Sequence, residues 1–196
     1  HVPCVAGDAL RLPVADDSVD LVVCQALLIN LPEPAAALGE FARVSTDLVA
    51  AIEPNNAAVS VDSTVDSEFA LEAQVREAYL RGINTDVALG EQVRSLFGEV
   101  GIEPLSTRQY DHEKRTEPPY SEDALRSAKR KASGGGLADH ETELRRGVDG
   151  ETYDTLRRAW REMGREVIEQ MQEESYERVE TVPFTVTVGQ VDSDAG

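Results

Sequence analysis

Three short apolar runs near the beginning of the chain predict buried strands. They are Val2–Ala6, Val19–Cys24 and Leu48–Ile52, and each is nearly continuous in apolar residues. Continuous runs are typical of parallel strands that are covered on both faces, whereas half-exposed strands alternate. The segment between the second and third runs predicts the crossover helix, and Pro34 suits its first turn.

Helical periodicity dominates the part of the chain that follows. Apolar side chains recur at helical spacing over residues 67–81 and 86–100, and a glycine ends each segment. Residues 102–110 then predict another strand. Strands that alternate with helices predict an α/β fold, so we expect a Rossmann-like, mainly parallel sheet.

The stretch from residue 111 to residue 180 is polar and rich in predicted helix. Ser121 suits a helix N-cap, and Gly134–Gly136 predicts a hinge or loop. A helix over 151–178 carries an apolar stripe at nearly heptad spacing, which fits either packing within its own domain or a homodimer seam. Residues 181–188 alternate, with their apolar side chains on one face, and predict a half-exposed antiparallel strand.

Composition narrows the classes of partner. The net charge of −18 argues against nucleic acid and anionic membranes, because both require a basic surface. Only three of the 19 basic residues are lysines, and such an acidic protein suits a halophilic cytosol in which salt screens the self-repulsion. Cys4 and Cys24 lie in apolar runs without metal-ligand spacing, so we expect two buried thiols, no metal site and a reducing cytoplasmic compartment.

Polar side chains follow each of the three predicted strands. Asp8 follows the first and Gln25 the second, and the group from Glu53 to Asn56 follows the third. Ligands of parallel α/β sheets bind beyond the carboxyl ends of the strands. There the Asp8 carboxylate can accept a hydrogen bond from an exocyclic amine, and the Ala9 N–H can donate one to a ring nitrogen. The alternative is an ordinary turn at Gly7-Asp8, since both residue types favour turns.

Four motifs together resemble a known family. They are V-A-G-D-A-L-R-L-P (5–13), D-D-S-V-D-L-V-V-C (16–24), L-L-I-N-L-P-E-P (27–34) and A-L-G-E-F-A-R-V (37–44). The combination resembles the class I S-adenosylmethionine-dependent methyltransferases over about residues 2–56. The resemblance implies a methyltransferase that transfers the sulfonium methyl of S-adenosyl-L-methionine to an unidentified acceptor. We expect a small molecule, and a protein acceptor is the alternative.

The resemblance also implies roles for particular residues. Asp8 would meet the adenine amine, and Ala9 would make the adjacent backbone contact. Cys24 and Gln25 would line the methionine and sulfonium part of the cofactor. Asn30 stands where relatives often carry histidine, near the cofactor and the substrate entrance.

The substrate side of the site would follow the third predicted strand, at Glu53, Asn55 and Asn56. A general base is needed for an oxygen acceptor or a protonated nitrogen acceptor. The sequence offers five candidates and singles out none of them as catalytic: Glu53, Tyr110, His112, Tyr120 and His140.

The chain departs from the family pattern in two ways. First, the Gly-rich loop after the family's first strand is absent, and so is the acidic residue after its second strand. We therefore expect the two strand–helix units that carry them to precede Val2. Second, the last two strands of the family are joined by a short hairpin, whereas residues 111–180 intervene here. We therefore expect residues 1–110 and 181–191 to form a Rossmann-like domain that is incomplete at its N-terminal side. Residues 111–180 would form a helical insertion (a lid, substrate cap or dimer element), and 192–196 a flexible tail. The alternative function is a truncated or degenerate methyltransferase fold that acts as a non-catalytic interaction module.

Overall fold

The computed structural model describes residues 4–83 and 88–191. The chain divides into two compact units. The first, which we call the sheet unit, comprises residues 1–56, 85–111 and 183–196, and the second, the helical unit, comprises 57–84 and 112–182. The strands β4 (Ile102–Thr116) and β5 (Arg178–Val191) contribute residues to both units and pair with each other.

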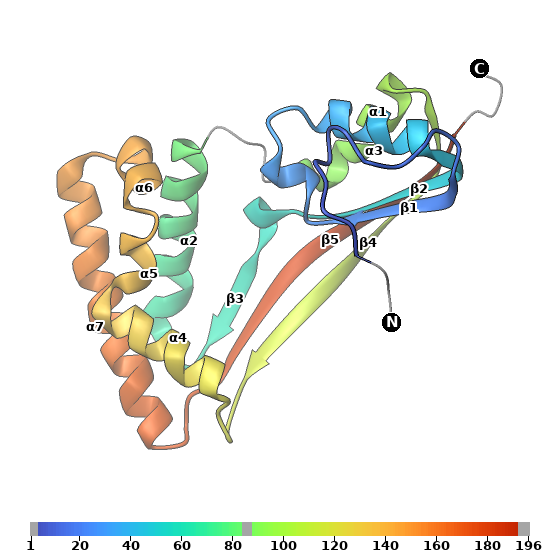
Figure 1. The fold of residues 1–196 in the computed structure, drawn as a ribbon. Helices are drawn as coiled ribbons and strands as arrows, with labels where there is room; N and C mark the ends of the chain where they lie inside the picture. The colour runs from blue at the N-terminus through green and yellow to red at the C-terminus, as the bar shows by residue number, and fades with distance from the viewer. Residues whose placement is uncertain (1–3, 84–87, 192–196) are drawn as a thin grey trace. The chain divides into compact units, whose positions relative to one another are not determined.

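The sheet unit is built around strands β1 (Val19–Gln25) and β2 (Ser45–Pro54), which pair in parallel. Helix α1 (Pro34–Val44) connects them, and Pro34 occupies its first turn as predicted. On its other side β2 pairs with residues 184–190 of β5 in antiparallel orientation. The α/β Rossmann-like class and the antiparallel last strand are thus confirmed (Figure 1).

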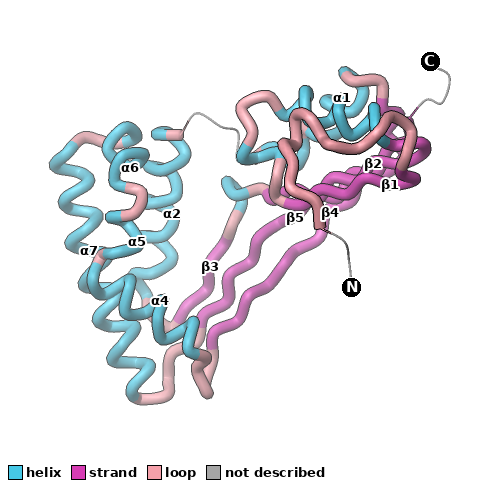
Figure 2. The backbone as a smooth tube through the Cα atoms, in the orientation of Figure 1, coloured by secondary structure: helices cyan, strands magenta, loops and turns pink. Residues whose placement is uncertain are grey.

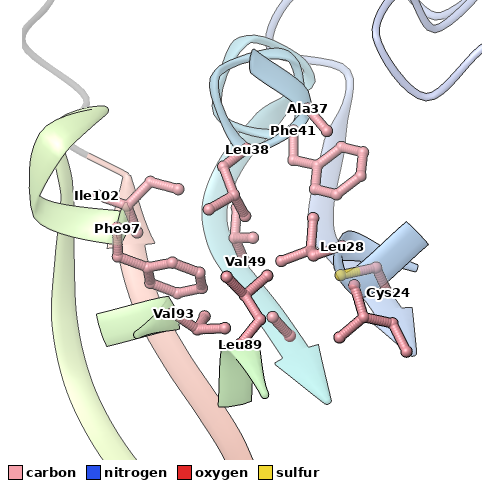
Figure 3. Packing of buried hydrophobic residues seen from close by; sticks show 12 residues of the cluster. Cys24, Leu28, Ala37, Leu38, Phe41, Val49, Leu89, Val93, Phe97 and Ile102 are labelled. Carbon is pink, nitrogen blue, oxygen red and sulfur yellow. The ribbon is translucent and has the colours of Figure 1, made fainter. Parts of the chain in front are cut away.

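One continuous apolar core fills the space between these strands and their helices. Leu38 and Phe41 of α1 point toward Val49 of β2, and Phe97 of α3 (Val93–Glu99) points toward Val49 from the other side (Figure 3). Leu28, in the 3₁₀ turn η1 (Leu28–Asn30), closes the core beside β1. Each of these side chains is at most 3% exposed. Their burial holds the carboxyl ends of β1 and β2 in a fixed arrangement.

Only one face of this sheet carries the core, although continuous apolar runs predicted cover on both faces. Leu21 and Val23 of β1 are 49% and 54% exposed. In β5 the buried positions are Thr185, Thr187 and Gly189, whereas the apolar side chains of the alternation are half-buried. The pairing explains this result, because Thr187 lies opposite Ala51, and directly paired residues share a face of the sheet.

Two predicted elements of this unit are wrong in part. No strand forms over the described residues of the run Val2–Ala6, and both Cys4 and Val5 are exposed, so Cys4 is not the buried thiol we expected. A strand needs a pairing neighbour for its backbone groups, and the described strands provide none there. The helix expected over 86–100 is a 3₁₀ turn, η3 (Leu89–Glu91), followed by the short α3, and residues 86 and 87 lie outside the described ranges.

Among the described residues, the helical unit contains five α-helices, the short strand β3 and the adjoining parts of β4 and β5, and the helices form one group (Figure 2). The strand β3 (Ser60–Ser63) pairs with residues 178–181 of β5 in antiparallel orientation. The helices are α2 (Asp66–Gly82), α4 (Glu122–Ser133), α5 (Gly135–Ala138), α6 (Glu141–Gly147) and α7 (Gly150–Gln172). The 3₁₀ turn η2 (Asn56–Ala58) precedes β3.

The long predicted helix exists as α7, but it ends at Gln172 rather than at residue 178, where β5 begins. Its apolar stripe is buried inside the helical unit, so these side chains pack within their own unit, which is the first of the two alternatives predicted for this helix. The buried members are Tyr153, Leu156, Trp160, Met163, Val167 and Met171. The expected hinge at 134–136 is a left-handed cap at Gly134, after which α5 begins directly.

The two units do not coincide with the expected domains. We expect residues 57–84 in the Rossmann-like domain and an insertion over 111–180, whereas the helical unit comprises 57–84 and 112–182. Helix α2 of the first segment packs against α6 and α7. The proposed tail, residues 192–196, lies outside the described ranges. No helix within the described residues combines the length and apolarity that a membrane span requires.

Candidate functional site

The chain makes a tight turn where β1 ends. Ala26 adopts a positive φ of 47°, a conformation that strains a residue with a β-carbon. Its N–H donates to the Ile52 carbonyl at 2.9 Å, and its own carbonyl accepts from Asn30 Nδ2 at 2.8 Å. The turn therefore begins from a strained residue that is tied to β2 on one side and to Asn30 on the other.

The Glu53 carboxylate satisfies the backbone of this turn. It accepts hydrogen bonds from the N–H groups of Leu27 and Leu28, both at 3.1 Å, and of Ile29 at 3.3 Å. Glu53 is fully buried, on the same face of β2 as Ala51. We expected Glu53 to border the substrate side, but its side chain is directed at the turn. Three backbone donors are the partners that a buried carboxylate needs.

Cys24 belongs to the same buried group. Its thiol lies 3.9 Å from Glu53 Oε1 and is only 6% exposed. Burial, together with the negative charge of Glu53, raises the pKa of the Cys24 thiol to about 12. The thiol is therefore neutral near pH 7, and its side chain is part of the core rather than of an open surface.

The loop that carries Asp8 and Ala9 packs on the same core as the turn. Asp8 is exposed, its Oδ1 accepts from Leu10 N–H at 3.0 Å, and its carbonyl accepts from Arg11 N–H at 3.0 Å. Ala9 is half-buried against the core cluster that contains Leu28. The structure thus brings the Asp8 loop and the β1 turn onto one core, although no strand precedes Asp8 among the described residues.

A pair of residues that we did not single out from the sequence fixes this loop. Glu40 Oε1 accepts from Leu12 N–H, and Arg43 donates to Glu40 and to the carbonyl of Val14 at 3.1 Å. The hydrogen bond from Arg43 lowers the pKa of Glu40 to about 2. The signal was present in the E-F-A-R segment of the fourth motif, where i,i+3 spacing puts both residues on one helix face.

The remaining predicted site residues end or follow β1 and β2, and they differ in how far they are exposed to solvent. Gln25 and Asn30 are exposed, and Asn55 and Asn56 are half-buried. Asn55 N–H donates to the Pro183 carbonyl at 2.8 Å. Its side-chain oxygen is covered and has no hydrogen-bond partner among the described residues. An unpaired acceptor at this edge fits a site that binds a hydrogen-bond donor.

The candidates for a general base other than Glu53 are divided between the two units. Tyr110 belongs to the sheet unit and is 54% exposed, whereas His112, Tyr120 and His140 belong to the helical unit. Tyr120 exchanges two hydrogen bonds of 3.0 Å with the backbone of Tyr176. The ring of His140 packs edge-on against another ring of the helical unit. The last two therefore have structural partners in the helical unit.

The helical unit contains a buried ionic cluster that the sequence did not indicate. Glu68 is fully buried and accepts from Tyr176 Oη, at 2.9 Å to Oε2, and from Lys131. Glu72 pairs with Lys131 and with Arg178, both at 2.8 Å. Although burial alone would raise the pKa of Glu72, the charges of Lys131 and Arg178 outweigh it, and the pKa is lowered. The cluster joins α2, α4 and the start of β5 within this unit.

Comparison with known proteins agrees with the motif resemblance. Residues 1–47 match the family model described as a methyltransferase domain. A demethylmenaquinone methyltransferase of Mycolicibacterium paratuberculosis is 38% identical over 99 residues, which cover 48% of this chain and 43% of that protein. One of a Mycobacterium species is 37% identical over 108 residues, covering 52% and 46%. The resemblance to methyltransferases is thus confirmed, and the chain spans less than half the length of these relatives.

A solved structure is similar to this chain at lower sequence identity. The YcgJ protein of Bacillus subtilis has a TM-score of 0.46 and 13% identity, with 95% of this chain and 70% of that chain covered.

Proposed function

We propose that this chain is part of an S-adenosylmethionine-dependent methyltransferase with a small-molecule acceptor. The observation that carries the proposal is the match of residues 1–47 to a methyltransferase domain, because this segment forms the loop and the strand that reach the candidate site. S-adenosylmethionine supplies a methyl group that its sulfonium has already activated. The protein then needs mainly to align the two reactants and to exclude water.

The residues at the strand ends have the chemistry to bind such a cofactor. The exposed Asp8 carboxylate would accept the adenine amine, and Ala9 N–H would donate to a ring nitrogen. Gln25 and Asn30 would flank the methionine end, on either side of the turn that Glu53 holds. Cys24 would contribute through its backbone, since its thiol is buried. The unpaired oxygen of Asn55 would serve as an acceptor on the substrate side.

A small-molecule acceptor fits the charge of the protein better than a nucleic acid does. The net charge of −18 would repel a polyanion. The helical unit also contains a cavity of about 420 Å³, bordered by Trp160, Met171 and Tyr176 among others, which is within the range of small-molecule sites. Because the relatives are demethylmenaquinone methyltransferases, demethylmenaquinone is the first acceptor to test. A cytoplasmic location agrees with this proposal and is part of it.

The second candidate function is a non-catalytic interaction module on a methyltransferase fold. Such a module would use the same fold without binding a cofactor. The two functions make different predictions for cofactor binding, since only the enzyme needs it.

Thermal unfolding in the presence of S-adenosylhomocysteine separates the two functions. A ligand at about 100 times its dissociation constant adds about 2.7 kcal/mol to the stability of the folded state. For a chain of this length, that corresponds to a rise of about 5–10 °C in the melting temperature. A rise for the wild type that is lost in Asp8→Ala supports the enzyme. An unchanged melting temperature at millimolar ligand rejects cofactor binding by this chain and favours the module.

A further inference from the structure

Hydrogen bonds from several residues hold the turn after β1 in one conformation. Ala26 is strained at φ 47°, and two hydrogen bonds fix its own N–H and carbonyl. Strained residues persist only where the surroundings over-determine them, and they cluster at functional sites. The side chains at both ends of this turn, Gln25 and Asn30, are exposed. The turn is therefore a rigid backbone element that presents two polar side chains at the strand ends.

Glu53 makes the largest number of these fixing interactions. Its Oε1 accepts from Leu27 and Leu28 N–H, and its Oε2 accepts from Ile29 N–H. These are orphan donors at the start of the short 3₁₀ helix, which has no side-chain cap of its own. Within the described residues, the hydrogen bonds of the Glu53 side chain go to this turn and to Cys24.

We propose that Glu53 is a positioning residue, which holds the turn at residues 26–30 in the conformation that presents Gln25 and Asn30 to the cofactor. The inference rests on the proposed function, and it assigns Glu53 a different task from that of a base or a substrate contact. An apolar residue at this buried position would pack on Ala51 without the cost of burying a carboxylate. The carboxylate is therefore explained by what it does for the turn rather than by core packing.

The two oxygens of Glu53 have different partners, and this difference gives the test a specific pattern. In Glu53→Gln the remaining carbonyl oxygen can still accept from Leu27 and Leu28 N–H. The new amide then faces Ile29 N–H, so two donors oppose each other. In Glu53→Ala all three donors lose their acceptor. If Glu53 only stabilised the core, its substitution would not change hydrogen exchange at the Ile29 amide more than at Leu27 and Leu28.

The experiment measures residue-resolved hydrogen exchange by NMR and S-adenosylhomocysteine affinity by calorimetry, both on the whole chain. Glu53→Gln should speed exchange at Ile29 by about tenfold or more, with smaller changes at Leu27 and Leu28. Glu53→Ala should speed it at all three. Affinity should fall by about tenfold in both variants, the loss expected for one hydrogen bond to a charged group. The matched control is Ile102→Ala, which removes buried volume elsewhere in the same unit and should lower the melting temperature while affinity stays at the wild-type value.

Several results would overturn the proposal. Unchanged affinity in a variant whose turn exchanges faster would show that the turn does not position the cofactor. Rapid exchange of the three amides in the wild type would show that Glu53 does not hold the turn, and this measurement needs no variant to fold. If the wild type shows the protected amides but binds no cofactor, the proposed function fails, and the cofactor role of Glu53 fails with it. A protected turn that loosens in Glu53→Gln together with weaker binding supports the inference.

Discussion

The crossing of α2 and α6 leaves no room for a β-carbon at Gly147. A β-carbon placed there would lie 1.8 Å from the Ala78 carbonyl oxygen and 2.8 Å from its carbonyl carbon. Ordinary contact begins at 3.4 Å, so the two helices would have to separate by about 1.6 Å. The neighbour is helical backbone, which cannot rotate away as a side chain can. Gly82 makes the reciprocal approach to the backbone of Glu143.

We expect Gly147→Ala to lower the free energy of unfolding of the helical unit by about 2 kcal/mol or more. Overpacking typically costs about 1–3 kcal/mol, and this clash with rigid backbone belongs at the upper end. Alanine regains at most about 1 kcal/mol through its helix propensity. The matched control is Gly136→Ala in α5, where no atom lies within 4 Å of the added carbon, so that only the gain remains.

Urea unfolding followed by Trp160 fluorescence measures this change, because Trp160 is the only tryptophan and is buried in the helical unit. If Gly147→Ala unfolds at the same urea concentration as the wild type or as Gly136→Ala, then α2 and α6 do not approach as closely as described.

Three further predictions concern single residues. Glu68→Gln should lower the free energy of unfolding by about 1.5–3 kcal/mol, because Lys131 loses one of its two charged partners and keeps Glu72; an unchanged urea midpoint would contradict this. Ala26→Gly should leave stability unchanged or raise it by about 1 kcal/mol, since it relieves the strain of a positive φ at some entropic cost, and a clear loss of stability on urea unfolding would contradict it. The pKa of Glu40 is about 4.5 in the unfolded chain and about 2 in the folded protein, so the ionised carboxylate stabilises the folded state above pH 4.5. This contribution is lost as the pH falls from about 4.5 to about 2. Wild type should therefore lose more stability than Glu40→Gln between pH 5 and pH 2.5 (circular dichroism), and parallel losses would reject this role of Glu40.

The elements that the sequence predicted well are those whose partners are close in the chain. The runs that became β1 and β2, and the helix between them, follow patterns that are local in the sequence. The face of β5 was harder to predict, because Thr185 and Thr187 become buried through pairing with β2, more than 130 residues away. Alternation alone suggested that the valines of this strand face the core.

The candidate site was predictable at the level of residues but not at the level of contacts. The position of Gln25 follows from the end of a strand, whereas that of Asp8 follows from the family pattern alone. The role of Glu53 cannot be predicted in this way, because a glutamate at the end of a strand is equally compatible with a solvent-facing base. Its three donors come from residues 24–26 positions earlier, and only the folded chain brings them together. The Glu68 cluster is hidden for the same reason, since its members come from α2, α4 and β5.

NMR shift mapping with S-adenosylhomocysteine tests whether the ends of β1 and β2 bind S-adenosylmethionine. We expect saturable amide shifts at Ala9 and over residues 25–30, because both segments pack on one core in the sheet unit. Shifts confined to other parts of the chain, or none at millimolar ligand, would contradict this expectation.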